Sequence, residues 1–360
     1  MKILLIGNSP AGMLLFREEL IMQLRKENEL AIICPNGDAQ QNARLSELGE
    51  FFPVEMERRG MNALQDIKLL AEYRRIVKKF APDKLITYTV KCNIYGGMAC
   101  PKGVEFFPNV TGLGRSFQGG AMTRLVTFLY KISVKNKAKK VFFENVADKE
   151  VLVERGIVKQ ENAIVLNGAG VNLDKFACKP LEKDDITKFV FVGRIMREKG
   201  VDELLWAIAE LKKINAKAQF VFLGEMEEDY RPQIDEFVAL GWLEWRGMVA
   251  NVADFLWQSD CLVLPSYHEG MSNAILEACS CGRAVIASDI NGCKEGVIDG
   301  KSGFVCKVQD KKSLFDCLLK FVNLSWQEKS NFGKNGRALV EEKFDKQKVV
   351  QATIKELFEQ

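Results

Sequence analysis

The sequence predicts an α/β fold with two Rossmann-like domains, each built on a parallel sheet. Apolar runs of strand length alternate with amphipathic stretches of helix length, an order typical of right-handed βαβ units. The alternation occurs twice, and each time the first strand runs into a glycine turn, at Gly7 and at Gly193. A chain of 360 residues is long enough for two such domains.

The first half of the chain alternates regularly until residue 88. Its apolar runs predict strands, and its periodic stretches predict helices that end at proline or glycine signals, as at 81–83. The expected strands are 2–6, 30–34, 51–56, 84–88 and 141–143, and the expected helices are 13–26, 39–48, 62–80 and a segment within 119–140.

The second half repeats this plan after a charged segment, 173–186, which contains a proline and no periodicity and therefore suits a linker. The expected strands are 188–192, 218–223, 243–247, 261–264, 283–287 and 303–308. The expected helices are 201–213, 251–258, one beginning at 272 or 273, and 311–322.

Composition excludes several functional classes. Apolar residues make up 47% and charged residues 28%, and the net charge of +3 is too small to indicate a nucleic-acid partner. The ten cysteines form no Cys-x-x-Cys pair, which favours reduced packing cysteines over a disulfide framework. His268 is the only histidine, so a histidine-based metal site is excluded. No signal peptide or long apolar run is recognised, and we expect a cytoplasmic protein.

The stretch after strand 261–264 carries the main functional signal. A loop leads into a helix at Ser272 or Asn273, and the free N–H groups of such a helix end suit a phosphate. Glu269 lies in the loop, and Glu277 lies one turn beyond Asn273. A nucleotide sugar would place its diphosphate on the helix end, its ribose diol on Glu277 and its sugar on Glu269. An ordinary helix with an acidic first turn has the same spacing, which leaves both interpretations open.

A second glycine-rich turn, from Gly7 to Gly12, follows the first strand. It is not G-x-G-x-x-G, and it lacks the lysine and hydroxyl residue of a P-loop, which weakens dinucleotide binding and ATP hydrolysis as functions. Close approach of the Gly12 backbone to a ligand and a simple packing turn both remain open.

Two motifs together resemble the retaining glycosyltransferases of the GT4 type. Glu269 and Glu277 match their E-x7-E signature, and Gly193–Gly200 matches their G-R-x-x-x-E-K-G loop. The resemblance implies a GT-B fold, in which a terminal helix at about 347–358 crosses back to the first domain. We therefore expect an acceptor domain of residues 1–172 with 345–360, and a nucleotide-sugar domain of residues 187–344.

The resemblance also implies the chemistry. Arg194 and Lys199 would neutralise the diphosphate leaving group without a metal, and Glu269 would position the sugar, with retention at the anomeric carbon. No cofactor is expected besides the UDP-sugar donor. The expected donor-binding residues are Gly12, Gly193, Gly224, Gly270, Met271, Ser272, Asn273 and Glu277.

Two loops of the first half resemble one GT4 branch, whose members add N-acetylgalactosamine and related sugars to undecaprenyl-diphosphate-linked saccharides. These loops read T-x-K-x-N-I-Y-G from residue 89 and T-G-L-G from residue 111, and Cys92 replaces a proline usual in the branch. GT4 enzymes outside this branch often carry a histidine in the N-terminal half of the site, and this half of the chain has none. Lys91 and Asn93 are the residues expected to replace its contact to the donor sugar. The expected acceptor-binding residues are Lys91, Asn93, Thr111, Gly112 and Asn145.

The segment 119–140 combines an apolar helical face with a basic end that contains Lys135, Lys137, Lys139 and Lys140. This profile suits a helix on an anionic membrane, and equally a half-buried helix with a solvated edge. With a lipid-linked acceptor, we expect peripheral attachment to the inner face of the cytoplasmic membrane.

The combined prediction is a retaining glycosyltransferase that moves an N-acetylhexosamine or hexose from a UDP-sugar to a polyprenyl-diphosphate-linked saccharide in bacterial glycan assembly. The alternatives are a UDP-sugar 2-epimerase type of enzyme, a transferase with a soluble acceptor, and a protein that only binds nucleotide sugars. The single histidine argues against the epimerase, because those enzymes use several histidines. The presence of Arg194, Lys199 and Glu269 argues against a binding-only protein.

Overall fold

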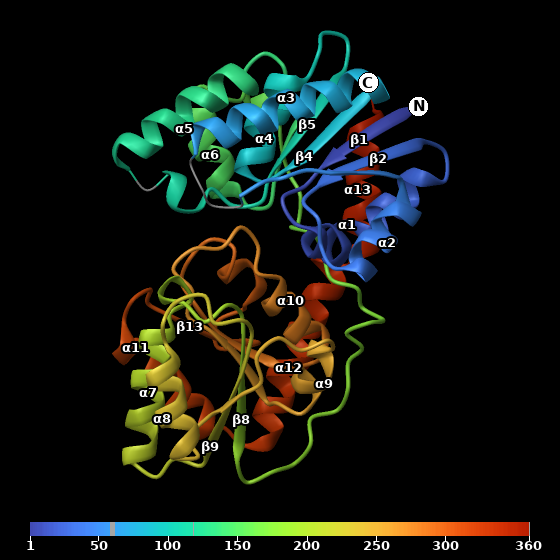
Figure 1. Ribbon diagram of the computed structural model, residues 1–360. Coiled ribbons are helices and arrows are strands. Elements are labelled where there is room, and N and C mark those ends of the chain that lie inside the picture. Colours follow the sequence, from blue (N-terminus) through green and yellow to red (C-terminus); the bar gives the residue numbers. More distant parts are fainter. Residues whose placement is uncertain (58–61, 118, 360) are drawn as a thin grey trace. The chain divides into compact units, whose positions relative to one another are not determined.

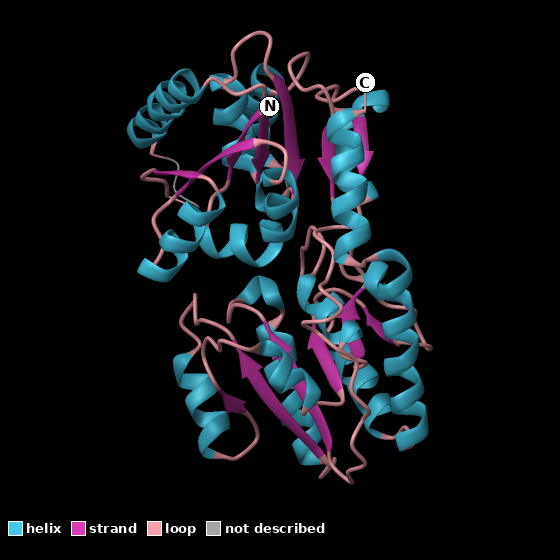
Figure 2. Ribbon diagram, turned by 90° about the vertical axis from the view of Figure 1, so that its right-hand side faces the viewer, coloured by secondary structure: helices cyan, strands magenta, loops and turns pink. Residues whose placement is uncertain are grey.

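A computed structural model describes residues 1–57, 62–117 and 119–359 (Figure 1). The chain forms two compact units: unit 1 is Met1–Ala169 with Gln347–Gln360, and unit 2 is Gly170–Lys346. In each unit helices cover both faces of a parallel sheet (Figure 2). The α/β fold with two Rossmann-like units is therefore confirmed. None of the described helices is long and apolar enough to cross a bilayer.

The sheet of unit 1 is entirely parallel, and its strand order is β3-β2-β1-β4-β5-β6-β7. The central strands are buried on both faces, which explains why they read as continuous apolar runs in the sequence. The strands are β1 (Lys2–Ile6), β2 (Glu29–Cys34), β3 (Glu50–Pro53), β4 (Lys84–Tyr88), β5 (Glu105–Val110), β6 (Val141–Phe143) and β7 (Ala163–Val165).

Two cores lie on the two faces of this sheet. Helices α3 to α6 share one core, and α1, α2 and α13 share the other. Their bounds are α1 (Pro10–Arg25), α2 (Ala39–Leu48), α3 (Ala63–Phe80), α4 (Val90–Ala99), α5 (Gly120–Ser133), α6 (Val146–Glu154) and α13 (Lys346–Phe358). Val350 and Leu357 of α13 are buried beside residues of β1, as expected for a terminal helix that returns to the first domain.

The sheet of unit 2 is also parallel, with the order β10-β9-β8-β11-β12-β13. Its strands are β8 (Thr187–Val192), β9 (Ala218–Leu223), β10 (Glu244–Trp245), β11 (Cys261–Leu264), β12 (Ala284–Ser288) and β13 (Gly303–Cys306). Its helices are α7 (Val201–Lys213), α8 (Arg231–Ala239), α9 (Val252–Trp257), α10 (Asn273–Ser280), α11 (Lys311–Val322) and α12 (Trp326–Lys343).

Several elements differ from the expectations. Strands β5 and β7 and helices α4, α6, α8 and α12 were not predicted, and α4 occupies most of the segment expected to be a site loop. The expected linker 173–186 belongs to unit 2, because the indole N–H of Trp257 donates to Ala177 O at 2.8 Å and Arg283 donates to Lys179 O at 3.0 Å. These buried donors come from elements distant in sequence, so local polarity did not reveal them.

Candidate functional site

The predicted donor residues gather at one edge of unit 2. Strands β9, β8 and β11 are neighbours and parallel, so the loops that follow them leave the sheet at the same, carboxyl edge. Ligands of open α/β sheets bind at this edge. The three loops are 193–200 after β8, 224–230 after β9 and 265–272 after β11.

An ion pair joins two of the predicted catalytic residues. The ammonium of Lys199 lies 2.5 Å from a carboxylate oxygen of Glu269, and the hydroxyl of Ser266 donates to the same oxygen at 2.8 Å. The backbone beside it is also fixed, because the Tyr267 N–H donates to Glu198 O at 2.8 Å. Residues that are 70 positions apart in sequence are thus held together as one group.

Glycines allow these loops to touch backbone to backbone. Gly200 has φ +71°, and a Cβ there would lie 2.1 Å from Pro265 O. Gly224 has φ +135°, and a Cβ there would lie 2.0 Å from Gly193 O. Both positions combine a left-handed backbone with a contact that excludes any side chain. The predicted glycine Gly224 therefore has a packing role that is independent of any ligand, whereas a Cβ at Gly193 would make only an ordinary contact, at 3.4 Å from Phe191.

The third predicted catalytic residue, Arg194, is also paired with a carboxylate. Its guanidinium lies 2.6 Å from Glu227, and the neighbouring Glu228 accepts the Arg197 N–H at 2.8 Å. Our sequence reasoning missed Glu227. The acidic run 225–229 directly after an apolar strand was the signal that could have identified it.

The helix end predicted to bind phosphate is present. Helix α10 begins at Asn273, and in the described structure its N-cap, Ser272, makes no side-chain capping bond to the helix. The Ser272 N–H donates to Gly292 O at 2.8 Å, and Gly292, which sequence reasoning missed, packs against Gly270 O. The side chain of Met271 is buried in the core of unit 2 and anchors the loop 265–272 there.

Glu277 lies on α10, one turn beyond its first residue, and is half-buried. Burial raises the pKa of Glu277 to about 7, while Lys175 and Lys346 oppose the shift. The described residues contain no group of three or more metal-ligating side chains that could hold an ion.

In unit 1, two predicted acceptor residues are engaged within the protein. Lys91 lies in the first turn of α4 and forms an ion pair with Asp66 at 2.8 Å. Asn93 is fully buried; its amide donates to Asn109 O at 2.9 Å and accepts the Thr87 hydroxyl at 2.7 Å. This burial corrects the prediction that Asn93 contacts the acceptor, because its side chain instead ties together strands β4 and β5.

The remaining predicted residues of unit 1 have different surroundings. Thr111 and Gly112 follow β5 at the carboxyl edge and are half-buried. Asn145 is buried and caps α6 by accepting an N–H of its first turn at 2.8 Å. Gly12 lies in the first turn of α1, where a Cβ would meet its nearest neighbour at 3.6 Å, an ordinary contact. The fold itself therefore does not require glycine at position 12.

A charged cluster that sequence reasoning missed lies at the same edge of unit 1. Arg17 of α1 and Glu144 after β6 form a largely buried ion pair at 2.8 Å. The Arg17 guanidinium lies 4.6 Å from the ring centre of Tyr88, and burial raises the pKa of Tyr88. The two residues are 127 positions apart, so no local sequence pattern could predict their contact.

The segment 119–140 is helical only as far as Ser133, where α5 ends. Three of the four lysines expected to face a membrane bind other parts of unit 1, in the pairs Lys137–Gly97, Lys139–Glu105 and Lys140–Glu356. Lys135 and Lys137 are both exposed. Local composition did not reveal these distant partners, and docking of this end on a membrane stays a prediction.

Two family matches cover most of the chain. The family described as Glycosyl transferase 4-like matches residues 2–145, and that described as Glycosyl transferases group 1 matches residues 186–323. The chain is a glycosyltransferase of the GT4 type. The resemblance inferred from the two sequence motifs is thereby confirmed, as is the prediction of an enzyme.

Relatives of this glycosyltransferase include bacterial enzymes with lipid-linked acceptors. It is 28% identical over 335 residues to the N,N'-diacetylbacillosaminyl-diphospho-undecaprenol alpha-1,3-N-acetylgalactosaminyltransferase of Campylobacter jejuni, covering 87% of each chain. It is 28% identical over 286 residues to the UDP-Gal:alpha-D-GlcNAc-diphosphoundecaprenol alpha-1,3-galactosyltransferase of Escherichia coli, covering 73% of this chain and 72% of that enzyme.

Solved structures share the fold of this glycosyltransferase. HepE of Anabaena, crystallised with UDP, matches with a TM-score of 0.77 and 17% identity, covering 99% of both chains. The sucrose-phosphate synthase of Thermosynechococcus elongatus matches with a TM-score of 0.81 and 17% identity, covering 99% of this chain and 98% of that one. These likenesses confirm the GT-B fold.

Proposed function

We propose that this glycosyltransferase transfers an N-acetylhexosamine or hexose from a UDP-sugar to a polyprenyl-diphosphate-linked saccharide, with retention and without a metal cofactor. The observation that carries the proposal is the arrangement at the carboxyl edge of unit 2. Two cations, Arg194 and Lys199, and two carboxylates, Glu269 and Glu277, lie on loops and a helix at that edge. Cations suit a diphosphate, and carboxylates suit hydroxyl groups.

Donor binding begins with an exchange of partners. In the unliganded protein each cation is neutralised by a carboxylate, Arg194 by Glu227 and Lys199 by Glu269. The diphosphate displaces these carboxylates and also accepts N–H groups at the start of α10. Glu269, released from Lys199, is then available to the sugar hydroxyls, and Glu277 to the ribose diol.

The chemical step follows the retaining scheme that the family resemblance implies. The acceptor hydroxyl attacks the anomeric carbon from the face of the leaving group, and a donor phosphate oxygen takes its proton. A new glycosidic bond forms as the bond to the diphosphate breaks. Arg194 and Lys199 stabilise the charge that develops on the leaving UDP.

The acceptor class is proposed from the relatives. Both the Campylobacter and the Escherichia enzymes are named for undecaprenyl-diphosphate-linked saccharides, and the match to each extends through most of its length. The loop after β5, with Thr111 and Gly112, remains the proposed place for the acceptor saccharide.

A panel of UDP-sugars with a short-chain polyprenyl-diphosphate saccharide tests this function. We expect UDP release that depends on the acceptor and a product extended by one sugar. UDP release that does not need the acceptor would support the epimerase or hydrolase alternative. Arg194→Ala and Lys199→Ala should lower turnover more than donor affinity, because their stabilisation is greatest in the transition state.

We also propose that the enzyme works on the inner surface of the cytoplasmic membrane, with α5 as the docking element. Large apolar side chains are exposed on one face of this helix, and they are Met122, Leu125, Phe128 and Ile132, named here the α5 strip. Apolar side chains on an exposed helix next to cations suit an anionic bilayer surface.

Vesicle sedimentation tests the docking. The double variant Phe128→Ser with Ile132→Ser should bind anionic vesicles several-fold more weakly, because less apolar area enters the bilayer. Val238→Ser, an equally exposed apolar position on α8 of unit 2, is the matched control and should leave binding unchanged. Equal sedimentation of all three proteins would remove α5 as the docking element.

A further inference from the structure

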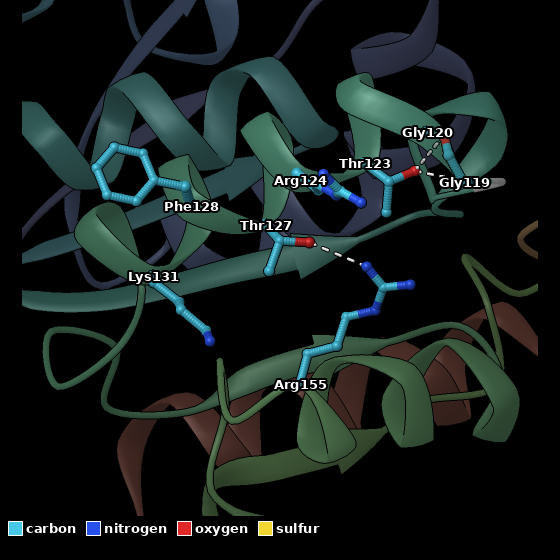
Figure 3. Close-up of a pocket in the computed structure, with 8 residues that line it drawn as sticks. All are labelled: Gly119, Gly120, Thr123, Arg124, Thr127, Phe128, Lys131 and Arg155. Atoms are coloured by element: carbon cyan, nitrogen blue, oxygen red, sulfur yellow. Dashed lines mark hydrogen bonds between the residues drawn. The ribbon is translucent and has the colours of Figure 1, made fainter.

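A cavity of about 480 Å³ lies along α5 in unit 1 (Figure 3). Its walls carry three cations, Arg124 and Lys131 from α5 and Arg155 from the end of α6, and no acidic residue lines it. Thr127, with its hydroxyl, and Phe128, with its aromatic ring, also line the cavity. The cavity is therefore a positively charged hollow with one apolar side.

Arg155 is held toward this cavity. Its guanidinium donates to the Thr127 hydroxyl at 3.0 Å (Figure 3). It also lies 5.0 Å from the ring centre of Phe117. These two contacts fix the plane of the guanidinium and leave donor groups to spare, since arginine has five N–H donors. A preorganised arginine is suited to a phosphate oxygen.

The three cations have no carboxylate partner within the described residues, in contrast to two lysines that follow α5 in the chain. Lys139 and Lys140 form ion pairs within unit 1. Three like charges around one hollow repel one another, and an anionic ligand removes that repulsion. The charge pattern thus points to a ligand with more than one negative charge.

The α5 strip adjoins the cavity. Phe128 belongs to both, lining the hollow while its residue is 59% exposed. A ligand that fits both surfaces has an anionic head and a hydrocarbon chain. Gly119 and Gly120 also line the cavity, and Gly119 follows Thr111 by eight residues, so this part of the hollow is close in sequence to the proposed place of the acceptor saccharide.

We propose that Arg124, Lys131 and Arg155 bind the diphosphate of the polyprenyl-linked acceptor, whose hydrocarbon chain leaves along the α5 strip. This inference rests on the proposed function and adds to it a recognition site for the acceptor head group. A diphosphate fits better than a single lipid phosphate, because three cations surround one hollow and a diphosphate offers more charge and more acceptor oxygens to them.

The test compares two acceptors in detergent: a short-chain polyprenyl-diphosphate saccharide, and the same saccharide on an uncharged aglycone. The triple variant Arg124→Gln, Lys131→Gln, Arg155→Gln should raise KM for the first acceptor at least about tenfold. It should leave KM for the second acceptor and for the UDP-sugar within about twofold of wild type. Lys135→Gln, an exposed lysine outside the cavity, is the matched control.

Further measurements separate the possible outcomes. Arg155→Lys keeps the charge but loses the fixed guanidinium plane, so it should raise KM for the diphosphate acceptor, though less than the triple variant does. Thermal unfolding shows whether each variant is folded. An unchanged KM in a folded triple variant would overturn the inference alone. The triple variant could instead keep its KM for the diphosphate acceptor and lose binding to anionic vesicles that contain no acceptor. That result would assign the cavity to bilayer head groups and would also overturn the inference. A wild-type enzyme that extends no diphosphate acceptor would overturn the proposed function itself.

Discussion

In the proposed donor site, Glu277 couples nucleotide binding to pH. Burial raises its pKa to about 7, so half of the unliganded molecules carry a protonated carboxyl there near neutral pH. The ionised form is the stronger acceptor for the two ribose hydroxyls, because both of its oxygens carry negative charge and neither carries a proton. In the proposed site, the pKa of the Glu277 carboxyl therefore sets the pH range in which the donor binds well.

We expect the affinity for a UDP-sugar to fall below pH 7, approaching about tenfold per pH unit. A UDP-sugar is the suitable probe, because its diphosphate does not titrate in this range. Glu277→Gln should bind about 1–3 kcal/mol more weakly and lose this pH dependence. Calorimetric titrations at pH 6, 7 and 8 measure both effects; a pH-dependent Gln variant would contradict the assignment.

The same shift predicts a stability effect of opposite sign. Because the folded-state pKa of Glu277 lies above the usual 4.5, the folded protein binds the proton more tightly than the unfolded chain. Its contribution to stability is complete below about pH 4.5 and is lost as pH rises through 7. Urea unfolding without nucleotide should show this loss between pH 5 and 8 in the wild type, and a smaller one in Glu277→Gln.

In the proposed mechanism Glu227 competes with the donor for Arg194, since Glu227 and Arg194 form a 2.6 Å ion pair. Removing this carboxylate frees the arginine, and Glu227→Gln should bind UDP more tightly by up to about 1 kcal/mol, the usual limit for a partly exposed pair. The neighbouring Glu228→Gln is the control, because Glu228 bonds a backbone N–H instead. Weaker UDP binding by Glu227→Gln would mean that this carboxylate belongs to the donor site.

At the scale of elements, α13 belongs to unit 1 although it follows unit 2 in the chain. Leu357 is fully buried among the residues of β1 and β2, and Lys140 ties the helix end through Glu356 at 2.8 Å. The docked helix completes one face of the first sheet, so its loss would expose that core.

Leu357→Ala should therefore destabilise unit 1 by about 2–4 kcal/mol, the usual cost of such a truncation in a core. Limited proteolysis followed by mass spectrometry should show earlier cleavage within residues 1–169 and little change in unit 2. Phe358→Ala, at a neighbouring exposed position, is the control. Preferential cleavage of unit 2 in Leu357→Ala would contradict this placement.

At the scale of the molecule, the proposed charge stabilisation comes from protein cations. Transfer should therefore survive EDTA at a rate close to that of the untreated enzyme. The measurement is UDP release with saturating donor and acceptor, before and after chelation. Activity that is lost with EDTA and restored by Mg²⁺ or Mn²⁺ would assign the diphosphate charge to a metal.

Local patterns determined the fold class and the proposed donor residues. Hydrophobic periodicity is a property of neighbouring residues, so segments such as 39–48, 84–88 and 201–213 were placed without knowledge of the fold. The E-x7-E and G-R-x-x-x-E-K-G motifs each lie within one loop and helix, which made Glu269, Glu277, Arg194 and Lys199 identifiable from sequence.

The tertiary structure alone decided which side chains meet. It pairs Lys199 with Glu269, buries Asn93 between two strands, and binds Lys140 to a helix 216 positions away. It also leaves Arg124, Lys131 and Arg155 around one hollow. The partner of a charge depends on which loops and helices the sheets bring together, and that arrangement is a product of long-range packing that no local pattern of residues contains.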